Sequence, residues 1–454
     1  MPVPDTIYAL SSGRPPAAVA VIRISGPAAR AVLEALTGRV PEPRRAAFAR
    51  VREPETGEVI DEALALWFPG PRSETGEDTA ELQVHGGRSI IAAVLAAIGR
   101  LPGLRLAEPG EFTRRAFENG RLDLTQVEAL GDLIYAETAA QRRQAFEQFR
   151  GLLGDRAEAW RQRAIEALAL VEAGIDFSDE GDVPRELMAR AVTIAGPLAD
   201  EIGEALAGAG RGERLREGLW VVIAGPPNAG KSTLLNRIAK RDAAIVSPTA
   251  GTTRDAIEVH LDLGGYPVNL IDTAGIQERS DDPVEQEGMR RAREHAARAD
   301  LVLWLVDAAV AGSPLPERQP GDAAPHWLVV SKADLIDKRI RERLDWRLKG
   351  RSDVHSVSAT TGAGIDELVT SIARFAETHF TREPALVTRE RQRVELTDVR
   401  RALAEAIALA EQGVGEELVA EQLRLAATAL GRLTGRIDVE EVLGAIFREF
   451  CVGK

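Results

Sequence analysis

This chain of 454 residues has few of the features that mark secreted and membrane proteins. It contains one cysteine, Cys451, which excludes an internal disulfide framework and suits a reducing cytoplasm. No apolar run reaches the roughly 20 residues that a membrane-spanning helix needs. The first residues also lack the basic run that precedes the apolar part of a signal peptide. We therefore expect a cytoplasmic protein without a membrane span.

Basic residues are in deficit: 57 Lys and Arg stand against 70 Asp and Glu, for a net charge of −13. Such a balance argues against a general nucleic-acid coat, although a local basic face is enough to bind RNA. One stretch, residues 141–163, carries six arginines against three acids. Its pattern favours a solvated helix face and leaves an RNA or partner surface as the alternative.

Proline is absent from residues 110–183 and again after Pro384, and both stretches place apolar residues at helical spacing. Between them, from Gly218 to Phe375, strand-like and helical runs alternate as in a doubly wound sheet. This order predicts one helical domain that is split in sequence by an inserted α/β domain, because the two ends of a domain usually lie close together.

Short β-rich runs alternate with helical segments before this helical region and predict a separate N-terminal α/β domain. The predicted fold is therefore a multidomain α/β and all-α protein. We place its limits at residues 1–121 for the N-terminal domain, 122–214 and 378–454 for the helical domain, and 215–377 for the insertion.

The segment Gly225–Ser232 matches the phosphate-binding loop G-x-x-x-x-G-K-[ST] at every position. It follows an apolar run, Leu219–Ala224, and precedes a helical run, so the motif has the strand and helix that it needs. Backbone N–H groups at the helix N-terminus then face a polyphosphate, and the helix dipole favours its charge. Lys231 is predicted to reach the β- and γ-phosphates, and the Ser232 hydroxyl to bind Mg²⁺.

Two later motifs identify the base as guanine. Asp272–Gly275 closes an apolar strand, so Asp272 is predicted to hold Mg²⁺ through water and the Gly275 N–H to contact the γ-phosphate. Ser331–Asp334 closes another strand, where the Asp334 carboxylate can accept two hydrogen bonds from guanine. Lys332 completes this motif, Ser331 stands where GTPases usually have Asn, and Ser358, Ala359 and Thr360 form a third loop near the base.

Further motifs are spread over the whole chain. They are Asp5-Thr6-Ile7, Arg23-Ile24-Ser25-Gly26, Thr75-Gly76-Glu77-Asp78, Glu81-Leu82-Gln83, His85-Gly86-Gly87, Pro109-Gly110-Glu111-Phe112, Arg121-Leu122-Asp123-Leu124, Ile175-Asp176-Phe177, Gly251-Thr252-Thr253-Arg254-Asp255 and Phe450-Cys451-Val452-Gly453-Lys454. With them the chain resembles the MnmE (TrmE) family of tRNA modification GTPases over essentially its whole length.

The resemblance implies an N-terminal tetrahydrofolate-binding domain that forms a homodimer, a discontinuous helical domain and an inserted Ras-like P-loop GTPase domain. The implied function is to add a (carboxymethyl)aminomethyl group to C5 of wobble uridine 34 of tRNAs. The implied partner is the FAD-dependent MnmG (GidA), in a heterotetramer or larger complex. GTP, Mg²⁺, K⁺ and 5-formyl- or 5,10-methylene-tetrahydrofolate are the implied substrate and cofactors.

The resemblance also assigns roles to residues. Thr253 would join Ser232 on Mg²⁺, oxygens of Asn228, Ser247, Thr249 and Thr252 would hold K⁺, and Glu285 would orient the attacking water. Cys451 would take part in the modification chemistry, and the folate contacts would be Arg23, Glu81, Arg121 and Lys454. The nucleotide site would also include Ala229, Gly230, Thr233, Pro248, Ala250, Gly251, Thr273 and Ala274.

Two alternatives come from other functional classes. The first is a ribosome-assembly or translation GTPase whose flanking domains bind RNA without folate chemistry. The second is a nucleotide-gated scaffold that dimerises on GTP and catalyses no modification. Binding of 5-formyltetrahydrofolate argues against the first, and K⁺-stimulated GTP turnover together with loss of modification on Cys451→Ser excludes the second.

Overall fold

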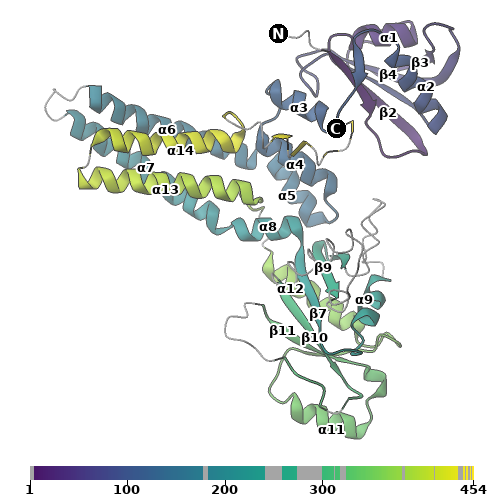
Figure 1. Cartoon of the computed structure of the whole chain (residues 1–454), viewed down its shortest axis with the longest axis vertical. Helices are drawn as coiled ribbons and strands as arrows, with labels where there is room; N and C mark the ends of the chain where they lie inside the picture. The colour runs from purple at the N-terminus through teal and green to yellow at the C-terminus, as the bar shows by residue number, and fades with distance from the viewer. Residues whose placement is uncertain are drawn as a thin grey trace, which may run out of the picture. The chain divides into compact units, whose positions relative to one another are not determined.

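The structure is a computed structural model of the whole chain, shown in Figure 1. It describes residues 5–176, 183–240, 258–272, 299–310, 312–316, 324–380, 384–413, 415–437, 443–444, 446–447, 450 and 452–453. The chain forms two compact units. One comprises residues 1–131, 148–199 and 398–454, and the other residues 132–147 and 200–397.

The first unit contains a six-stranded sheet in the order β3-β4-β5-β2-β1-β6. All neighbouring strands are antiparallel except β1 and β6, which are parallel. Strand residues alternate between the two faces, so Ala20, Ile22 and Ile24 are buried while Val21 and Arg23 face the other side. The strands are β1 Thr6–Leu10, β2 Ala17–Ser25, β3 Ala47–Arg52, β4 Val59–Phe68, β5 Thr79–Gly86 and β6 Leu104–Leu106.

Two helices, α1 (Ala29–Thr37) and α2 (Arg88–Gly99), cover the buried face of this sheet. Val32 and Leu33 of α1 and Val94 of α2 share one apolar core with the inward side chains of the strands. The opposite face of the sheet, which carries Val21 and Arg23, is not covered by α1 or α2. A third helix, α3 (Glu111–Glu118), leads to the helical part of the chain.

The helical part of the first unit is built from segments that lie on both sides of the α/β insertion. Helix α6 (Leu152–Asp176) and helix α14 (Glu416–Thr434) lie along one another, as Figure 1 shows. Both helices carry buried small and apolar residues, among them the fully buried Trp160 of α6 and Leu430 of α14. Helices α4 (Leu124–Tyr135), α7 (Val183–Ala207) and α13 (Glu390–Gln412) connect the two units.

The second unit contains another six-stranded sheet, in the order β12-β11-β10-β7-β9-β8. It is parallel except for the edge strand β8. Its central strands are apolar on both faces, as expected when helices cover both sides. The strands are β7 Leu219–Ala224, β8 Glu258–Leu263, β9 Tyr266–Asp272, β10 Leu301–Asp307, β11 His326–Ser331 and β12 Val354–Ser356, and the helices α9 Lys231–Ala239, α11 Lys338–Arg347 and α12 Ile365–His379.

Helix α5 (Ala139–Phe149) packs, through its first part, on the second sheet rather than on the long helices. Ala140 N donates to Gly265 O (3.0 Å) in the turn between β8 and β9. Gln141 and Gln144 donate to the Arg216 and Gly212 carbonyls (3.0 and 3.1 Å) of the short helix α8, Ala209–Glu217. The β8–β9 hairpin is thus tied to a segment that lies outside the α/β insertion.

These elements confirm the predicted fold class: an N-terminal α/β domain, a discontinuous helical domain and an inserted P-loop domain. The strand before the phosphate-binding loop forms as predicted, and the helix after it, predicted over Ser232–Ala239, begins one residue earlier, at Lys231. The exact domain limits remain predictions. Among the described residues, no helix is both long and apolar enough to cross a bilayer.

Candidate functional site

The phosphate-binding loop lies between the end of β7 and the start of α9. Gly225, Asn228 and Gly230 have φ values of +143°, +61° and +94°, so the loop curls through conformations that L side chains rarely adopt. At Gly225 a Cβ would also come within 2.9 Å of the Leu305 carbonyl oxygen. The loop therefore depends on glycine at this position for both its backbone and its packing.

Lys231 occupies the centre of this loop. Its side chain is 8% exposed, and Nζ donates to the carbonyl oxygens of Gly225 and Pro226, each at 3.1 Å. These two hydrogen bonds from the Lys231 ammonium fix the backbone of the loop around the side chain. A polyphosphate offers it charged acceptors, which form stronger hydrogen bonds than carbonyl oxygens do. Ala229 is buried beside it, while Asn228 and Thr233 are exposed.

Two of the three residues predicted to hold Mg²⁺, Ser232 and Asp272, meet directly. The Ser232 hydroxyl, in the first turn of α9, donates to Asp272 Oδ2 at the end of β9. Asp272 is 2% exposed, so its carboxylate is held in place by the sheet. A hydroxyl and a carboxylate are the hard oxygen ligands that Mg²⁺ prefers. This donor set fits a magnesium ion beside the phosphate-binding loop.

The loop after β11, which the sequence predicts to contact guanine, has a neighbour that the sequence did not reveal. Lys332 Nζ forms a 2.7 Å ion pair with Asp307 Oδ2, and Asp307 is buried at the end of β10. Asp307 Oδ1 also accepts from Ala309 N (2.9 Å), which fixes the carboxylate. The sequence signal that could have revealed Asp307 is its position at the carboxyl end of a parallel strand, where ligand-contacting residues are common.

Asp334 is brought to the third predicted loop. Ser358 Oγ donates to Asp334 Oδ1 at 2.5 Å and accepts from Thr361 N at 3.1 Å. The Ser331 hydroxyl is buried and donates to the Val306 carbonyl, at 3.4 Å. The structure therefore joins the loops after β11 and β12 through Ser358 and Asp334, with the half-buried Ala359 and exposed Thr360 beside them.

A second group of predicted residues lies on the N-terminal sheet, on the face that α1 and α2 leave open. Arg23 and Glu81 are opposite one another on β2 and β5. Arg23 Nε and Nη2 donate to Glu81 Oε1 at 3.0 and 2.8 Å, and Nη1 reaches Glu74 at 2.5 Å. Glu81 Oε2 accepts no hydrogen bond from the described residues. Two residues of the predicted folate site, Arg23 and Glu81, therefore pair with one another.

Arg121 lies at the same loop. Its Cγ is 3.3 Å from where a Gly76 Cβ would stand, and Gly76 adopts φ +82°. The guanidinium of Arg121 is exposed and makes no ion pair with the part of the chain that the structure describes. The loop of residues 74–76 thus contacts two predicted folate-binding arginines, Arg23 through Glu74 and Arg121 through Gly76.

Three of the sequence motifs meet at Arg115, a residue that the sequence analysis did not single out. Arg115 Nη2 donates to Asp5 Oδ1 (2.7 Å) and Glu111 Oε1 (3.2 Å), and Nη1 to Glu77 Oε2 (3.1 Å). Burial raises the pKa of the Glu111 carboxyl, but hydrogen bonds from Arg105, the Glu108 N–H and Arg115 outweigh it, so the net pKa is lowered. Its spacing of four residues from Glu111 on α3 is the local signal that could have revealed Arg115.

The end of the chain lies against the N-terminal domain. Val452 pairs with Pro109, and a Cβ on Gly453 (φ +96°) would come within 2.2 Å of the Leu10 carbonyl oxygen. Phe447 and Phe450 anchor this segment against Val127 of α4. The tail therefore lies against Pro109 and the last residue of β1, in the sheet that carries Arg23.

Several predicted site residues lie outside the described residues, so the structure does not place them. They are Ser247, Pro248, Thr249, Ala250, Gly251, Thr252, Thr253, Thr273, Ala274, Gly275, Glu285, Cys451 and Lys454.

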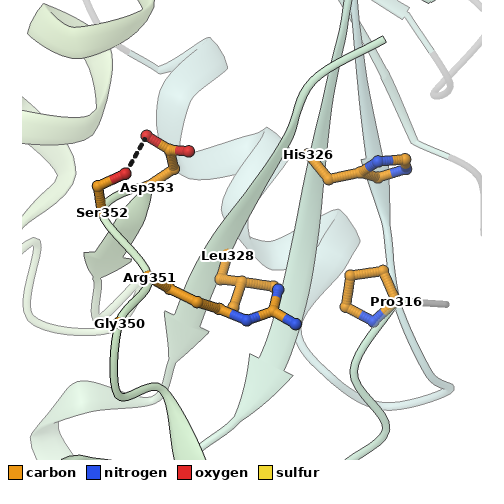
Figure 2. Close-up of a pocket in the computed structure, with 7 residues that line it drawn as sticks. All are labelled: Pro316, His326, Leu328, Gly350, Arg351, Ser352 and Asp353. Carbon is orange, nitrogen blue, oxygen red and sulfur yellow. Dashed lines mark hydrogen bonds between the residues drawn. The ribbon is translucent and has the colours of Figure 1, made fainter. Parts of the chain in front are cut away.

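A pocket of about 380 Å³ lies at the other edge of the second sheet. Its lining includes His326, the first residue of β11, and Arg351 to Asp353, just before β12, as Figure 2 shows. The nucleotide motifs follow the carboxyl ends of these parallel strands, whereas this pocket is at their amino ends. It is therefore separate from the nucleotide site.

Comparison with known proteins agrees with this arrangement. A profile described as the GTP-binding protein TrmE N-terminus matches residues 6–121, and one described as the MnmE helical domain matches residues 124–451. Proteins named tRNA modification GTPase MnmE match end to end: the one from Bradyrhizobium sp. BTAi1 is 55% identical over 100% of both chains, and that from Azorhizobium caulinodans ORS 571 is 54% identical over 99% of both. One from Rhodopseudomonas palustris BisB18 is 56% identical over 99% of both chains. This chain belongs to the MnmE family of tRNA modification GTPases.

Proposed function

We propose that this chain hydrolyses GTP as one component of a complex that adds a (carboxymethyl)aminomethyl group to C5 of wobble uridine 34 in tRNAs. The observation that carries the proposal is the assembly, at one edge of one sheet, of Lys231, the Ser232–Asp272 pair and the Asp334–Ser358 pair. These groups recognise a polyphosphate, a magnesium ion and a guanine respectively.

In this proposal the chain's own residues bind and orient the nucleotide. Lys231 leaves the Gly225 and Pro226 carbonyls for the β- and γ-phosphates, while the first N–H groups of α9 donate to the same oxygens. Ser232 and Asp272, with Thr253, would hold Mg²⁺, and that ion would neutralise negative charge on the phosphates. Asp334 accepts from guanine, and the Asp307–Lys332 ion pair holds the Lys332 stem beside the base.

Potassium is proposed as the monovalent cation of the reaction. Its ligands would be oxygens of Asn228, Ser247, Thr249 and Thr252, and it would supply the positive charge that an arginine finger brings to other GTPases. Asn228 is exposed on the phosphate-binding loop, so its side chain is accessible to such an ion. Glu285 is proposed to orient the attacking water, and pairing of two GTPase domains to complete the site.

The N-terminal domain is proposed to hold the tetrahydrofolate, as its 5-formyl or 5,10-methylene form, which supplies the carbon of the new group. Glu81 Oε2, which accepts from none of the residues that the structure describes, suits the N–H groups of a pterin, and the exposed Arg121 suits the anionic glutamate tail. Lys454 would add a contact, and Cys451 would act as a nucleophile or tuned thiol near the one-carbon unit. The contacts of Val452 with Pro109 and of Gly453 with Leu10, at the end of β1, support this assignment.

A homodimer through the N-terminal domains is proposed on the open face of the first sheet. Phe48 and Leu64 are opposite one another on β3 and β4, are 57% and 42% exposed, and lie on the same face as Arg23 and Glu81. Exposed apolar residues in a row on one sheet face are typical of an interface.

The proposed partners beyond the second copy are tRNA and the FAD-dependent MnmG (GidA). The proposed compartment is the cytoplasm.

The test is GTP hydrolysis by the purified chain in KCl and in NaCl, with Glu285→Ala as the variant and Glu287→Ala as its matched control. We expect strong stimulation by K⁺ that Glu285→Ala abolishes and Glu287→Ala retains. Equal rates in both salts would contradict the potassium mechanism. Failure to bind 5-formyltetrahydrofolate would favour a GTPase without folate chemistry.

A further inference from the structure

Helix α11 and the turn after it form a strongly cationic surface in an acidic protein. The fourteen residues 338–351 contain seven Lys or Arg and two acids, whereas the whole chain has a net charge of −13. The cations are Lys338, Arg339, Arg341, Arg343, Arg347, Lys349 and Arg351. This surface is distinct from the arginine-rich stretch at residues 141–163, where Arg161 is engaged by Glu158 through two hydrogen bonds of 3.0 Å.

Two of the seven cations anchor the helix. Arg343 and Arg347 are half-buried and donate to the carbonyls of Ala308 (2.9 Å) and Ser313 (2.7 Å). Leu344 packs with Ala308 in a small core, and Asp337 caps the helix by accepting from Ile340 N at 2.8 Å. Helix α11 is therefore fixed on the second sheet as a rigid support.

The other five cations are exposed, and none of them forms an ion pair or a side-chain hydrogen bond with a described residue. They are Lys338, Arg339, Arg341, Lys349 and Arg351. Glu342 and Asp345 share the exposed side of the helix and lower its net charge, so attraction for an anion will be local and sensitive to salt. Arg351 also lines the pocket of Figure 2, where its side chain extends along the wall formed by Leu328, so the surface continues into a recess.

The same helix carries Trp346, which is 79% exposed. No other large hydrophobic side chain in the described part of the chain is as exposed. Trp346 follows Arg339 by seven residues, about two helical turns, so the two side chains lie on one stripe of the helix. An indole that is exposed and forms no hydrogen bond with a described residue offers a flat face on which a nucleobase can stack.

We propose that α11, with the turn to Arg351, is a docking surface for the tRNA substrate. The five exposed cations contact phosphates, and Trp346 stacks on an unpaired base. Single-stranded and looped RNA is recognised by this combination of cations and an aromatic face, whereas an acidic protein partner would need no stacking platform. The proposal rests on the tRNA-modifying function proposed above, and it assigns one RNA contact to the GTPase domain.

The experiment measures binding of a fluorescently labelled tRNA transcript to the full chain over a salt series. Arg339→Gln combined with Arg341→Gln should lower the affinity about tenfold or more and reduce the slope of log K against log salt by about two. Trp346→Ala should lower the affinity about five- to a hundredfold and leave the slope unchanged, while Trp346→Phe retains most of the binding. GTP hydrolysis should stay at the wild-type rate in every variant.

The matched control is Arg142→Gln with Arg143→Gln, two exposed arginines of α5 from the basic stretch at residues 141–163. It should leave affinity and slope unchanged. The proposal is overturned if the α11 variants bind tRNA as the wild type does, if the control pair loses as much affinity, or if wild-type chain binds no tRNA. Binding to phosphatidylglycerol vesicles is measured for the same variants. If the α11 variants lose binding to the vesicles but keep binding to tRNA, the surface is a membrane-binding surface and the proposal is overturned.

The wobble nucleosides of tRNA from cells separate this inference from the proposed function. If the wild-type chain restores the modified uridine in a strain that lacks its own enzyme while the α11 variants bind tRNA normally, only the inference fails. If the wild-type chain does not restore it, the proposed function fails whatever the binding data show.

Discussion

Asp334→Asn should convert the nucleotide site from guanine to xanthine. In the structure one carboxylate oxygen of Asp334 is held by Ser358 Oγ at 2.5 Å. An asparagine oxygen can keep that hydrogen bond, which leaves its NH₂ group facing the base. Guanine presents two donors at this edge, so donors would face donors. Xanthine has a carbonyl in place of the exocyclic amine, and the NH₂ group can donate to it.

The size of the effect follows from the two hydrogen bonds lost. Each bond to a charged group contributes about 1.5–3 kcal/mol, so the loss is about 3–6 kcal/mol. Since about 1.4 kcal/mol corresponds to a factor of ten, GTP affinity should fall by about two to four orders of magnitude. Affinity for xanthosine triphosphate should rise above that of the wild type.

The assay is displacement of a fluorescent nucleotide by GTP and by xanthosine triphosphate. Asp337→Asn is the matched control, because Asp337 caps α11 through Ile340 N and asparagine caps a helix about as well. Its nucleotide affinities should be those of the wild type. If Asp334→Asn binds GTP within about threefold of the wild type and gains no affinity for xanthosine triphosphate, Asp334 does not read the base.

Three further predictions concern binding and stability. Asp307→Asn weakens its ion pair with Lys332 (2.7 Å) and should lower GTP affinity about tenfold in the same assay. The pKa of Glu111 is lowered in the folded protein, so its contribution to stability is present above its ordinary pKa of 4.5 and is lost as the pH falls through the lowered value. The free energy of unfolding in urea should therefore be smaller at pH 3.5 than at pH 7. This difference between the two pH values should be smaller in Glu111→Gln. Leu430→Ala, fully buried on α14, should destabilise the chain by about 2–5 kcal/mol in urea, while Leu425→Ala, 48% exposed on the same helix, should change stability by less than about 0.5 kcal/mol.

The sequence predicted the parts of this molecule that depend on local pattern. The strand before Gly225 and the helix after Gly230 follow from a short apolar run and a motif, and both form. The split helical domain also follows from pattern, because proline-free stretches with helical spacing flank the insertion, and α6 and α14 pack on one another. Arg23 and Glu81 were selected through the family resemblance, and their cross-strand pairing accounts for their meeting.

Contacts between distant segments could not be predicted in the same way. The Asp307–Lys332 pair depends on the register of β10 and β11, which no local motif encodes. Arg115 gains its partners from segments about 38 and 110 residues away, so only the folded sheet brings them together. The exposed face of α11 also escaped the sequence analysis, because charge alone did not reveal which cations the fold engages.

The account's central claim is that GTP hydrolysis by this chain serves modification of the wobble uridine. The most direct test is to quantify the modified nucleosides in tRNA from a bacterium that lacks its own enzyme and expresses this chain or its Lys231→Ala variant. The account predicts that the wild-type chain restores 5-(carboxymethyl)aminomethyl-type uridines and that Lys231→Ala, which loses the phosphate-binding ammonium, does not. Restoration by both chains, or by neither, would contradict it.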